Sequence, residues 1–311
     1  MGEFLYCKDK QVYDIDNNIV INNNLLPGYM RKMENSPYKF KEWIKLRYSS
    51  NTNSIARKLK GITFGQGNRV RIDTETHALS LCDCYWIKSD SEDIKFKDVS
   101  PYYTDFWKGE GIYNGKSVPT LYVTGYMDKY WVNSKYLCKL CKEALIEIEC
   151  YKVCKACNVR VANILKYGDN GILVENVTNI KYMLEQADQS GLMDPDNYDE
   201  NNIERLFKYD GIRMIVIDAI IGNGDRHLGN FGWLRDTDTG EYVDMSPLYD
   251  FDHALDSKLR YDRLIEDAIN ICKINQNYID EALRICKTVV NMDTIDIFKI
   301  RASSLIEHIN I

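Results

Sequence analysis

Residues 218–252 read DAIIGNGDRHLGNFGWLRDTDTGEYVDMSPLYDFD, and they are the most informative part of the sequence about the fold. The strongly apolar segment 212–221 has helical spacing and ends at Gly222-Asn223-Gly224, because glycine stops a helix and opens a tight turn. The short apolar segments 230–234 and 241–245 flank a polar Asp-Thr-Asp-Thr-Gly turn, which predicts a β-hairpin. We therefore expect a buried helix, a glycine-rich loop and a hairpin, in that order.

Three polar side chains stand within this frame: Asp225 and Asn230 in the loop, and Asp250 after the hairpin. Phosphoryl transfer needs a carboxylate that orients or deprotonates the attacking hydroxyl, and an amide oxygen and a second carboxylate that hold Mg²⁺. Oxygen ligands suit such a hard cation, whereas zinc prefers cysteine and histidine. The spacing predicts Asp225 as the base, with Asn230 and Asp250 as metal ligands. Aspartates also occur in turns for conformational reasons alone, and we interpret Asp236 and Asp238 in that way.

The segments GNGDRHLGNFG and PLYDFDHAL resemble the catalytic loop and the metal-binding segment of HipA-like and CtkA-like Ser/Thr kinases. The first is also similar to the G-D-R-H-x-x-N loop of phosphatidylinositol-3-kinase-like enzymes. The resemblance implies an α+β, bilobal protein-kinase-like fold, ATP and Mg²⁺ as cofactors, and the roles given above for the three polar residues. Arg226 and His227 are interpreted as residues that hold the loop in place.

The resemblance also implies partners for this centre in the first half of the chain. Lys139 lies on the short strand-like segment 136–140, where these kinases place the lysine that contacts ATP phosphates. A glutamate on the next helix should pair with that lysine. Glu147 matches the family position, while Glu143 lies nearer the apolar stripe, so both stay candidates. The segment before Lys139 corresponds to the nucleotide loop, with Gly125 as its only glycine and Thr124 as an autophosphorylation site by analogy.

The two halves of the chain differ in character, which predicts two lobes. Residues 1–174 are rich in short strand-like segments, such as 12–22, 118–123, 136–140 and a hairpin over 161–174. Residues 175–311 show helical spacing over 180–189, 203–221, 261–274, 278–290 and 295–309. We therefore expect an N-terminal region with a strand-rich kinase N-lobe over 1–174, and a helical C-lobe over 175–311.

The ten cysteines permit a zinc interpretation, because Cys138-x₂-Cys141 and Cys154-x₂-Cys157 are separated by a spacing that zinc modules use. A second interpretation fits the pattern better. Ile146, Cys150, Cys154 and Cys157 fall on one stripe of a helix, where reduced cysteine behaves as a small buried hydrophobe. We therefore expect these thiols in the core.

The composition of the chain limits the kinds of binding partner and the cellular location that we expect. The net charge of −6, with acidic and basic residues interspersed, disfavours direct nucleic-acid binding. No run of about 18 apolar residues and no signal-like start is present, so no membrane association and a cytoplasmic location are expected. A protein substrate is expected, and the family resemblance adds an antitoxin-type partner. Two alternatives stay open: a small-molecule or lipid kinase with the same centre, and a nucleotide-binding pseudokinase or interaction module.

Overall fold

A computed structural model describes residues 2–46, 77–103, 112–113, 116–117, 129–140, 143–193, 200–255 and 261–309. The chain forms two compact units, and each is built from several segments. The first unit comprises Met1–Cys141, Leu173–Leu192 and Gly232–Asp244, and the second comprises Lys142–Ile172, Met193–Phe231 and Met245–Ile311. The units are thus interleaved along the sequence, and the division into lobes at residue 174 stays a prediction.

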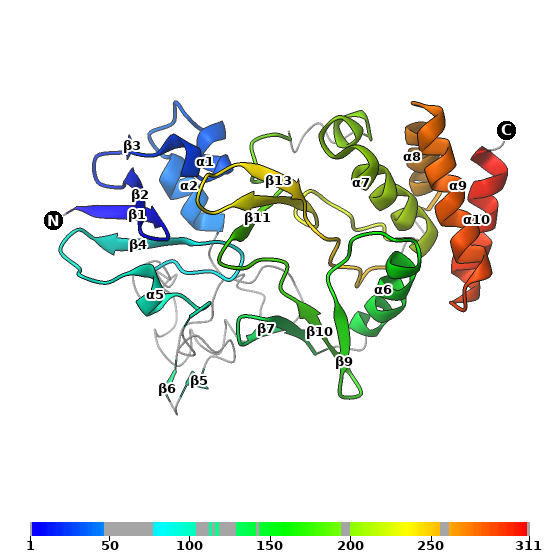
Figure 1. Ribbon diagram of the computed structural model, residues 1–311, viewed down its shortest axis with the longest axis horizontal. Coiled ribbons are helices and arrows are strands. Elements are labelled where there is room, and N and C mark those ends of the chain that lie inside the picture. The colour runs from blue at the N-terminus through cyan, green and yellow to red at the C-terminus, as the bar shows by residue number, and fades with distance from the viewer. Residues whose placement is uncertain are drawn as a thin grey trace, which may run out of the picture. The chain divides into compact units, whose positions relative to one another are not determined.

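The first unit is built on a four-stranded antiparallel sheet with the strand order β3-β2-β1-β4 (Figure 1). Its strands are β1 (Glu3–Cys7), β2 (Lys10–Asp14), β3 (Ile19–Val20) and β4 (Tyr85–Ser89). The segment 12–22, expected as one strand, is two strands because Asn17 bonds back to Asp14 and forms a turn. Short helices accompany the sheet: η1 (Asn23–Leu25), α1 (Gly28–Lys32), α2 (Lys39–Leu46) and α5 (Phe96–Val99).

Further strands of the first unit pair with one another. The strands β7 (Lys129–Val132) and β8 (Tyr136–Lys139) pair as an antiparallel hairpin, and the short strands β5 (Ile112–Tyr113) and β6 (Lys116–Ser117) pair with each other. A three-stranded sheet has the order β11-β12-β13, with β11 (Tyr182–Gln186), β12 (Gly232–Asp236) and β13 (Tyr242–Met245). The last two strands confirm the hairpin expected around the polar turn.

The helix predicted over 180–189 is wrong, because the structure has the strand β11 there. Its inward side chains alternate, with Met183, Glu185 and Ala187 buried. The carboxylate of Glu185 bonds to the N–H of Gly28 and to the guanidinium of Arg235, which is fully buried. A charged residue is normally expected to face solvent, but Glu185 points into the core with its partner Arg235. This charge concealed the inward–outward alternation that is typical of a strand.

The second unit is mainly helical (Figure 1). Its elements are η2 (Glu143–Leu145), α6 (Ile146–Ala156), β9 (Ile164–Tyr167), α7 (Glu200–Ile221), α8 (Tyr261–Cys272), α9 (Gln276–Asn291) and α10 (Asp296–Ile309). The strand β10 (Gly171–Glu175) begins in this unit, and the β9–β10 turn confirms the predicted hairpin. Helix α7 packs against α8, α9 and α10, as the helical spacing of the C-terminal half predicts.

The cysteines of α6 lie in the core. Cys150, Cys154 and Cys157 have no solvent exposure, and burial raises the pKa of Cys157 to about 11 and that of Cys154 further. Neutral thiols are poor zinc ligands. Within the described part of the chain, no group of side chains arranged to hold a metal includes a cysteine. The described thiols therefore follow the core interpretation, while Cys141 lies outside the described residues.

One acidic side chain between the helices should make stability depend on pH. Glu281 on α9 accepts hydrogen bonds from Arg284 and from Arg213 on α7, and these lower its pKa to about 2. Since the folded pKa lies below the ordinary 4.5, the ionised group stabilises the fold above that pH, and the contribution fades as pH falls toward 2. We expect Glu281→Gln to lower the free energy of unfolding by about 1–2 kcal/mol at pH 7, after discounting for solvent screening.

Urea midpoints measured from pH 7 down to pH 3 would check this expectation, with the exposed Glu266→Gln as the control on α8. The difference between wild type and Glu281→Gln should shrink steadily below pH 4.5. An equal difference at every pH would assign the effect to packing instead of charge.

None of the described helices has the length and hydropathy of a membrane span.

Candidate active site

The loop that carries Asp225 begins where α7 ends. The N–H groups of Gly222 and Asn223 both donate to the carbonyl oxygen of Asp218, at 2.8 and 2.9 Å. Gly222 has φ +71°, a left-handed conformation that closes helices and favours glycine. This ending directs the chain out of the helix, so Asp225 is held in a loop of defined shape and remains partly exposed.

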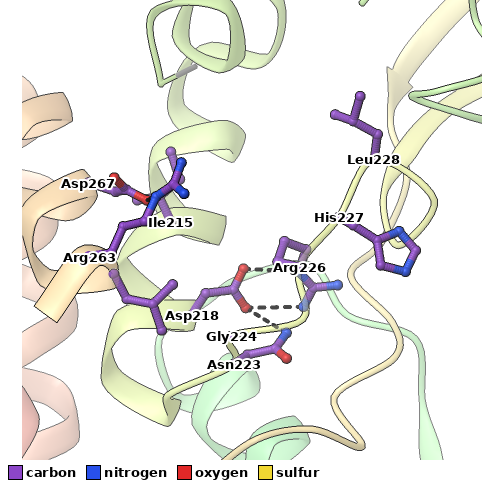
Figure 2. A pocket seen from close by; sticks show the side chains of 10 residues that line it. Ile215, Asp218, Asn223, Gly224, Arg226, His227, Leu228, Arg263 and Asp267 are labelled. Carbon is purple, nitrogen blue, oxygen red and sulfur yellow. Dashed lines mark hydrogen bonds and ion pairs between the residues drawn. The ribbon is translucent and has the colours of Figure 1, made fainter. Parts of the chain in front are cut away.

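Arg226 connects this loop to two other segments, and Figure 2 shows its contacts with Asp218 at the end of α7. Its Nε and Nη2 donate to the two carboxylate oxygens of Asp218, at 2.9 and 3.1 Å. Its Nη1 donates to the carbonyl oxygens of Asn230 and Tyr249, at 2.9 and 2.7 Å. Asn223 adds a third donor to the Asp218 carboxylate at 3.1 Å. One guanidinium thus joins the end of α7, the catalytic-type loop and the residue before Asp250.

This ion pair is buried, and its charges are compensated locally. Arg226 also lies over the ring of Phe251, 5.0 Å from the ring centre to the guanidinium carbon. Burial alone would lower the pKa of Arg226, but the charge and hydrogen bonds of Asp218, with a contribution from Asp250, raise it above its usual value. The guanidinium is therefore permanently charged, and the loop-holding role expected for Arg226 agrees with its contacts.

Asn230 and His227 shape the same loop from within. The side-chain nitrogen of Asn230 donates to the carbonyl oxygen of Asp225 at 2.9 Å, which directs the side-chain oxygen away from that bond. The N–H of Gly229 donates to Nδ1 of the exposed His227 at 3.0 Å. Asp225 and Asn230 are thereby fixed to each other through the backbone, in the spacing that the sequence indicated.

Asp250 stands on a separate segment, and the two residues before it are anchored to other parts of the second unit. Leu248 pairs with Val161 in a parallel bridge, and its N–H donates to the carbonyl oxygen of Arg160. The hydroxyl of Tyr249 donates to the carbonyl oxygen of Gly229 at 3.2 Å. Asp250 itself has φ +62°, an uncommon conformation for a residue with a side chain. Such a conformation persists only where the surrounding contacts determine it.

Three carboxylates gather at this segment. Ligand oxygens of Glu147, Asp250 and Asp252 all lie within 4.8 Å of one another. Glu147 comes from α6 and is fully buried, and its Oε2 accepts from the N–H of Phe251 at 3.3 Å. A buried carboxylate beside two others favours a bound cation, because like charges in a low-dielectric site repel strongly.

The first unit holds a pair of buried cations. In the β7–β8 hairpin Lys129 is the cross-strand partner of Lys139, and their exposures are only 6% and 2%. Directly opposed residues of an antiparallel pair share one face of the sheet, where like charges destabilise the pairing. Two ammonium groups on one face are typical of a site that receives an anion.

The sequence-predicted residues are therefore brought together in part. Asp225, Asn230, Asp250 and Glu147 all belong to the second unit, whereas Lys139 belongs to the first, so its pairing with Glu147 stays a prediction. Gly125 and Thr124 lie outside the described residues, and so does the predicted strand over 118–123.

Sequence reasoning missed Asp218, Asp252 and Lys129. Lys129 had a usable signal, since placing the turn at 133–135 of the hairpin sets Lys129 opposite Lys139. Asp252 follows Asp250 at a spacing of two, but Asp250 has φ +62°, so the alternation of an extended strand does not explain why their carboxylates meet. Asp218 carried no distinguishing signal within an apolar helix.

A pocket of about 240 Å³ lies behind the loop, between α7 and α8 (Figure 2). Its lining includes Asp218, Asn223 and Arg226 from the ion-pair assembly, and Arg263 and Asp267 from α8. The three predicted polar residues do not line it. The pocket is therefore separate from the three side chains that the sequence predicts as catalytic.

Comparison with known proteins identifies the fold. No protein-family profile and no curated protein matches the chain. A chain in the structure of the Shewanella oneidensis MR-1 toxin–antitoxin system HipA, HipB and its operator DNA aligns with a TM-score of 0.56 and 14% identity. The alignment covers 99% of this chain and 96% of that chain. The Helicobacter pylori proinflammatory kinase CtkA aligns with a TM-score of 0.37 and 17% identity, over 58% of this chain and 89% of that chain. The Shewanella likeness confirms the expected HipA-like α+β fold.

Proposed function

We propose that this chain is a protein Ser/Thr kinase that transfers the γ-phosphoryl group of ATP to a hydroxyl with the help of Mg²⁺. The observation that carries the proposal is the set of contacts made by Arg226. One buried guanidinium donates through Nη1 to the carbonyl oxygens of Asn230 and Tyr249, while its Nε donates to the carboxylate of Asp218. The residues proposed as metal ligands, Asn230 and Asp250, are thereby positioned from a common support, which is what phosphoryl transfer requires of a protein.

The proposed reaction uses Asp225 as the group nearest the acceptor. The hydroxyl oxygen of the acceptor forms a bond to the γ-phosphorus, and the bond from that phosphorus to the bridging oxygen breaks. ADP leaves with the electron pair of that bond, while the carboxylate of Asp225 orients the hydroxyl and takes its proton. The partial exposure of Asp225 leaves it accessible to an acceptor.

The side chains around Asp250 fit a magnesium ion. The side-chain nitrogen of Asn230 donates to the carbonyl oxygen of Asp225, so its side-chain oxygen is the atom that would bind the ion. Asp250 supplies a carboxylate, and the nearby Glu147 and Asp252 add negative charge. These are hard oxygen donors of the kind that Mg²⁺ prefers. When bound, the ion neutralises charge on the β- and γ-phosphates.

The pair Lys129 and Lys139 is proposed to receive the triphosphate. Two ammonium groups on one face of the β7–β8 hairpin supply the positive charge that a polyphosphate needs. We expect Lys129→Met to weaken ATP binding by about 10- to 100-fold, because a charge-assisted contact contributes about 1.5–3 kcal/mol. Calorimetric titration with ATP and Mg²⁺ would measure it.

The exposed turn lysine Lys135 provides the matched control in the same hairpin. Lys135→Met should leave the affinity within about twofold, since a solvent-exposed charge contributes little. Equal weakening in both variants would attribute the effect to general charge, and Lys129 would then have no specific role.

The partners proposed for the chain follow from the activity and from the Shewanella structure. A protein acceptor is proposed because the loop resembles those of Ser/Thr kinases. The Shewanella system pairs HipA with HipB on operator DNA. By analogy, an antitoxin-type protein is proposed as a binding partner of this chain.

Intact mass measured after incubation with ATP and Mg²⁺ tests the proposal directly. Wild type, offered protein, lipid and small-molecule acceptors in separate arms, should add about 80 Da to itself or to a protein acceptor, the mass of one phosphoryl group. Phosphorylation confined to a lipid or small molecule would change the acceptor class. Stabilisation by ATP and Mg²⁺ without turnover in any arm would indicate a nucleotide-binding module and overturn the kinase proposal.

A further inference from the structure

The first residue of the loop, Gly222, is packed against an arginine from the C-terminal helix. A Cβ atom placed on Gly222 would stand 2.7 Å from Cζ and 2.9 Å from Nη2 of Arg301, and closer still to Nη1. These separations are shorter than real Cβ contacts, so the guanidinium, which is the end of a flexible side chain, would have to shift before any side chain could occupy this position. Gly222 is buried.

Arg301 is held at this place by its own helix. In α10 the side chains of Phe298, Ala302 and Leu305 are buried, and the helix packs against α7 and α9. The guanidinium therefore reaches the C-terminal end of α7 from a rigid element. A cation at this end of a helix interacts favourably with the backbone carbonyls that lack partners within the helix.

Gly222 also participates in the assembly that supports Asp225. Its N–H and that of Asn223 bind the carbonyl oxygen of Asp218, whose carboxylate binds Arg226. A displacement of Gly222 would thus move both the backbone that leads to Asp225 and the residue that anchors Arg226. A misplacement of about 1 Å in such a support can cost about 100-fold in rate.

We propose that Arg301 is a positioning residue, which fixes the point where the loop leaves α7 and so sets the location of Asp225. The link to catalysis rests on the proposed kinase function, while the contact with the loop does not. The predicted consequence is that loss of the guanidinium loosens residues 222–230 without removing any group that touches a substrate.

Hydrogen exchange tests this inference independently of activity. In Arg301→Ala, amides in a peptide spanning 222–231 should exchange at least about tenfold faster, because the loop loses its external support. Lys299→Ala is the matched control, since it removes a cation from the same helix two residues earlier. Equal exchange in wild type and Arg301→Ala would overturn the inference.

Glycine substitutions test the contact itself. Gly168 has φ +62° and open space around its Cα, so Gly168→Ala reports backbone strain alone. Gly222→Ala adds the collision with Arg301, and its urea midpoint should fall by about 0.5 M more than that of Gly168→Ala. The excess should disappear when Gly222→Ala is combined with Arg301→Ala. If the additional fall in the urea midpoint persists in the Arg301→Ala background, the contact between Gly222 and Arg301 is not its cause.

Steady-state kinetics separates positioning from simple loss of stability. Well below the unfolding temperature, Arg301→Ala should lower kcat by about 10- to 100-fold while KM for ATP changes less than about twofold. Arg301→Lys should recover part of kcat, because it restores the charge but not the planar group. Wild-type kcat in a folded Arg301→Ala variant would sink the inference and leave the kinase proposal intact. An inactive wild type would sink the kinase proposal, while the exchange and midpoint measurements would still decide on the contact.

Discussion

Asp225→Ala should lower kcat for phosphotransfer by about 10²–10⁴-fold and leave the fold intact. The expected loss follows from the role of a general base, which contributes that much to a proton-transfer step. Asp225 is partly exposed, and the bond that Asn230 makes to residue 225 uses its backbone carbonyl. Removing the carboxylate therefore leaves the described hydrogen bonds of the loop in place.

Radiolabel transfer from ATP would measure the rate, with circular dichroism and the urea midpoint as checks on folding. Asp293→Ala, at an exposed acid between α9 and α10 in the second unit, is the matched control and should keep wild-type kcat. Full activity in Asp225→Ala would remove this residue from the mechanism and require another base.

Arg226→Met should destabilise the protein by about 3–5 kcal/mol, the second large effect that we expect. The substitution leaves the Asp218 carboxylate buried with only part of its bonding, and breaking a buried pair by removing one partner carries that cost. It also releases the carbonyls of Asn230 and Tyr249. Phosphotransfer should therefore fall at any temperature at which the variant remains folded.

A double variant separates these two effects. Asp218→Leu combined with Arg226→Met removes both charges. The loss of unfolding free energy in the double variant should therefore be smaller than the sum of the two single losses. Phosphotransfer should stay low, because the carbonyls of Asn230 and Tyr249 still lack their shared donor. Recovery of activity together with stability would mean that Arg226 only stabilises the fold. Chemical denaturation and initial rates on the same preparations provide the two measurements.

The sequence predicts those parts of the site that depend only on residues close together in the chain. The helix end at Gly222, the spacing from Asp225 to Asn230 and the polar turn before Asp250 are short-range patterns with a conformational cause. The support given by Asp218 and Arg226 depends on which buried groups meet in space. No local pattern distinguishes an aspartate that will bind an arginine eight residues later from one that caps a turn.

The strand β11 shows the same limit for the fold. Its apolar residues fit a helical period nearly as well as an alternating one, and Glu185 interrupts the alternation with a charge. That charge is buried only because Arg235, fifty residues later, lies beside it. Lys129 was missed for a related reason, since its importance comes from the register of β7 against β8. Register is a property of the pair and cannot be assigned to either strand alone.

The interleaving of the two units has a consequence during synthesis on the ribosome. The strand β11 has no partner on one side until β12 has emerged, because the pairing joins Tyr182–Gln186 to Gly232–Asp236. An unpaired edge is a site at which a nascent chain can associate wrongly with another. The whole of helix α7, from the second unit, is made in the interval between the two strands. A chain that stops translation before residue 232 would therefore have an incomplete first unit, and we expect such fragments to need chaperones or to be degraded.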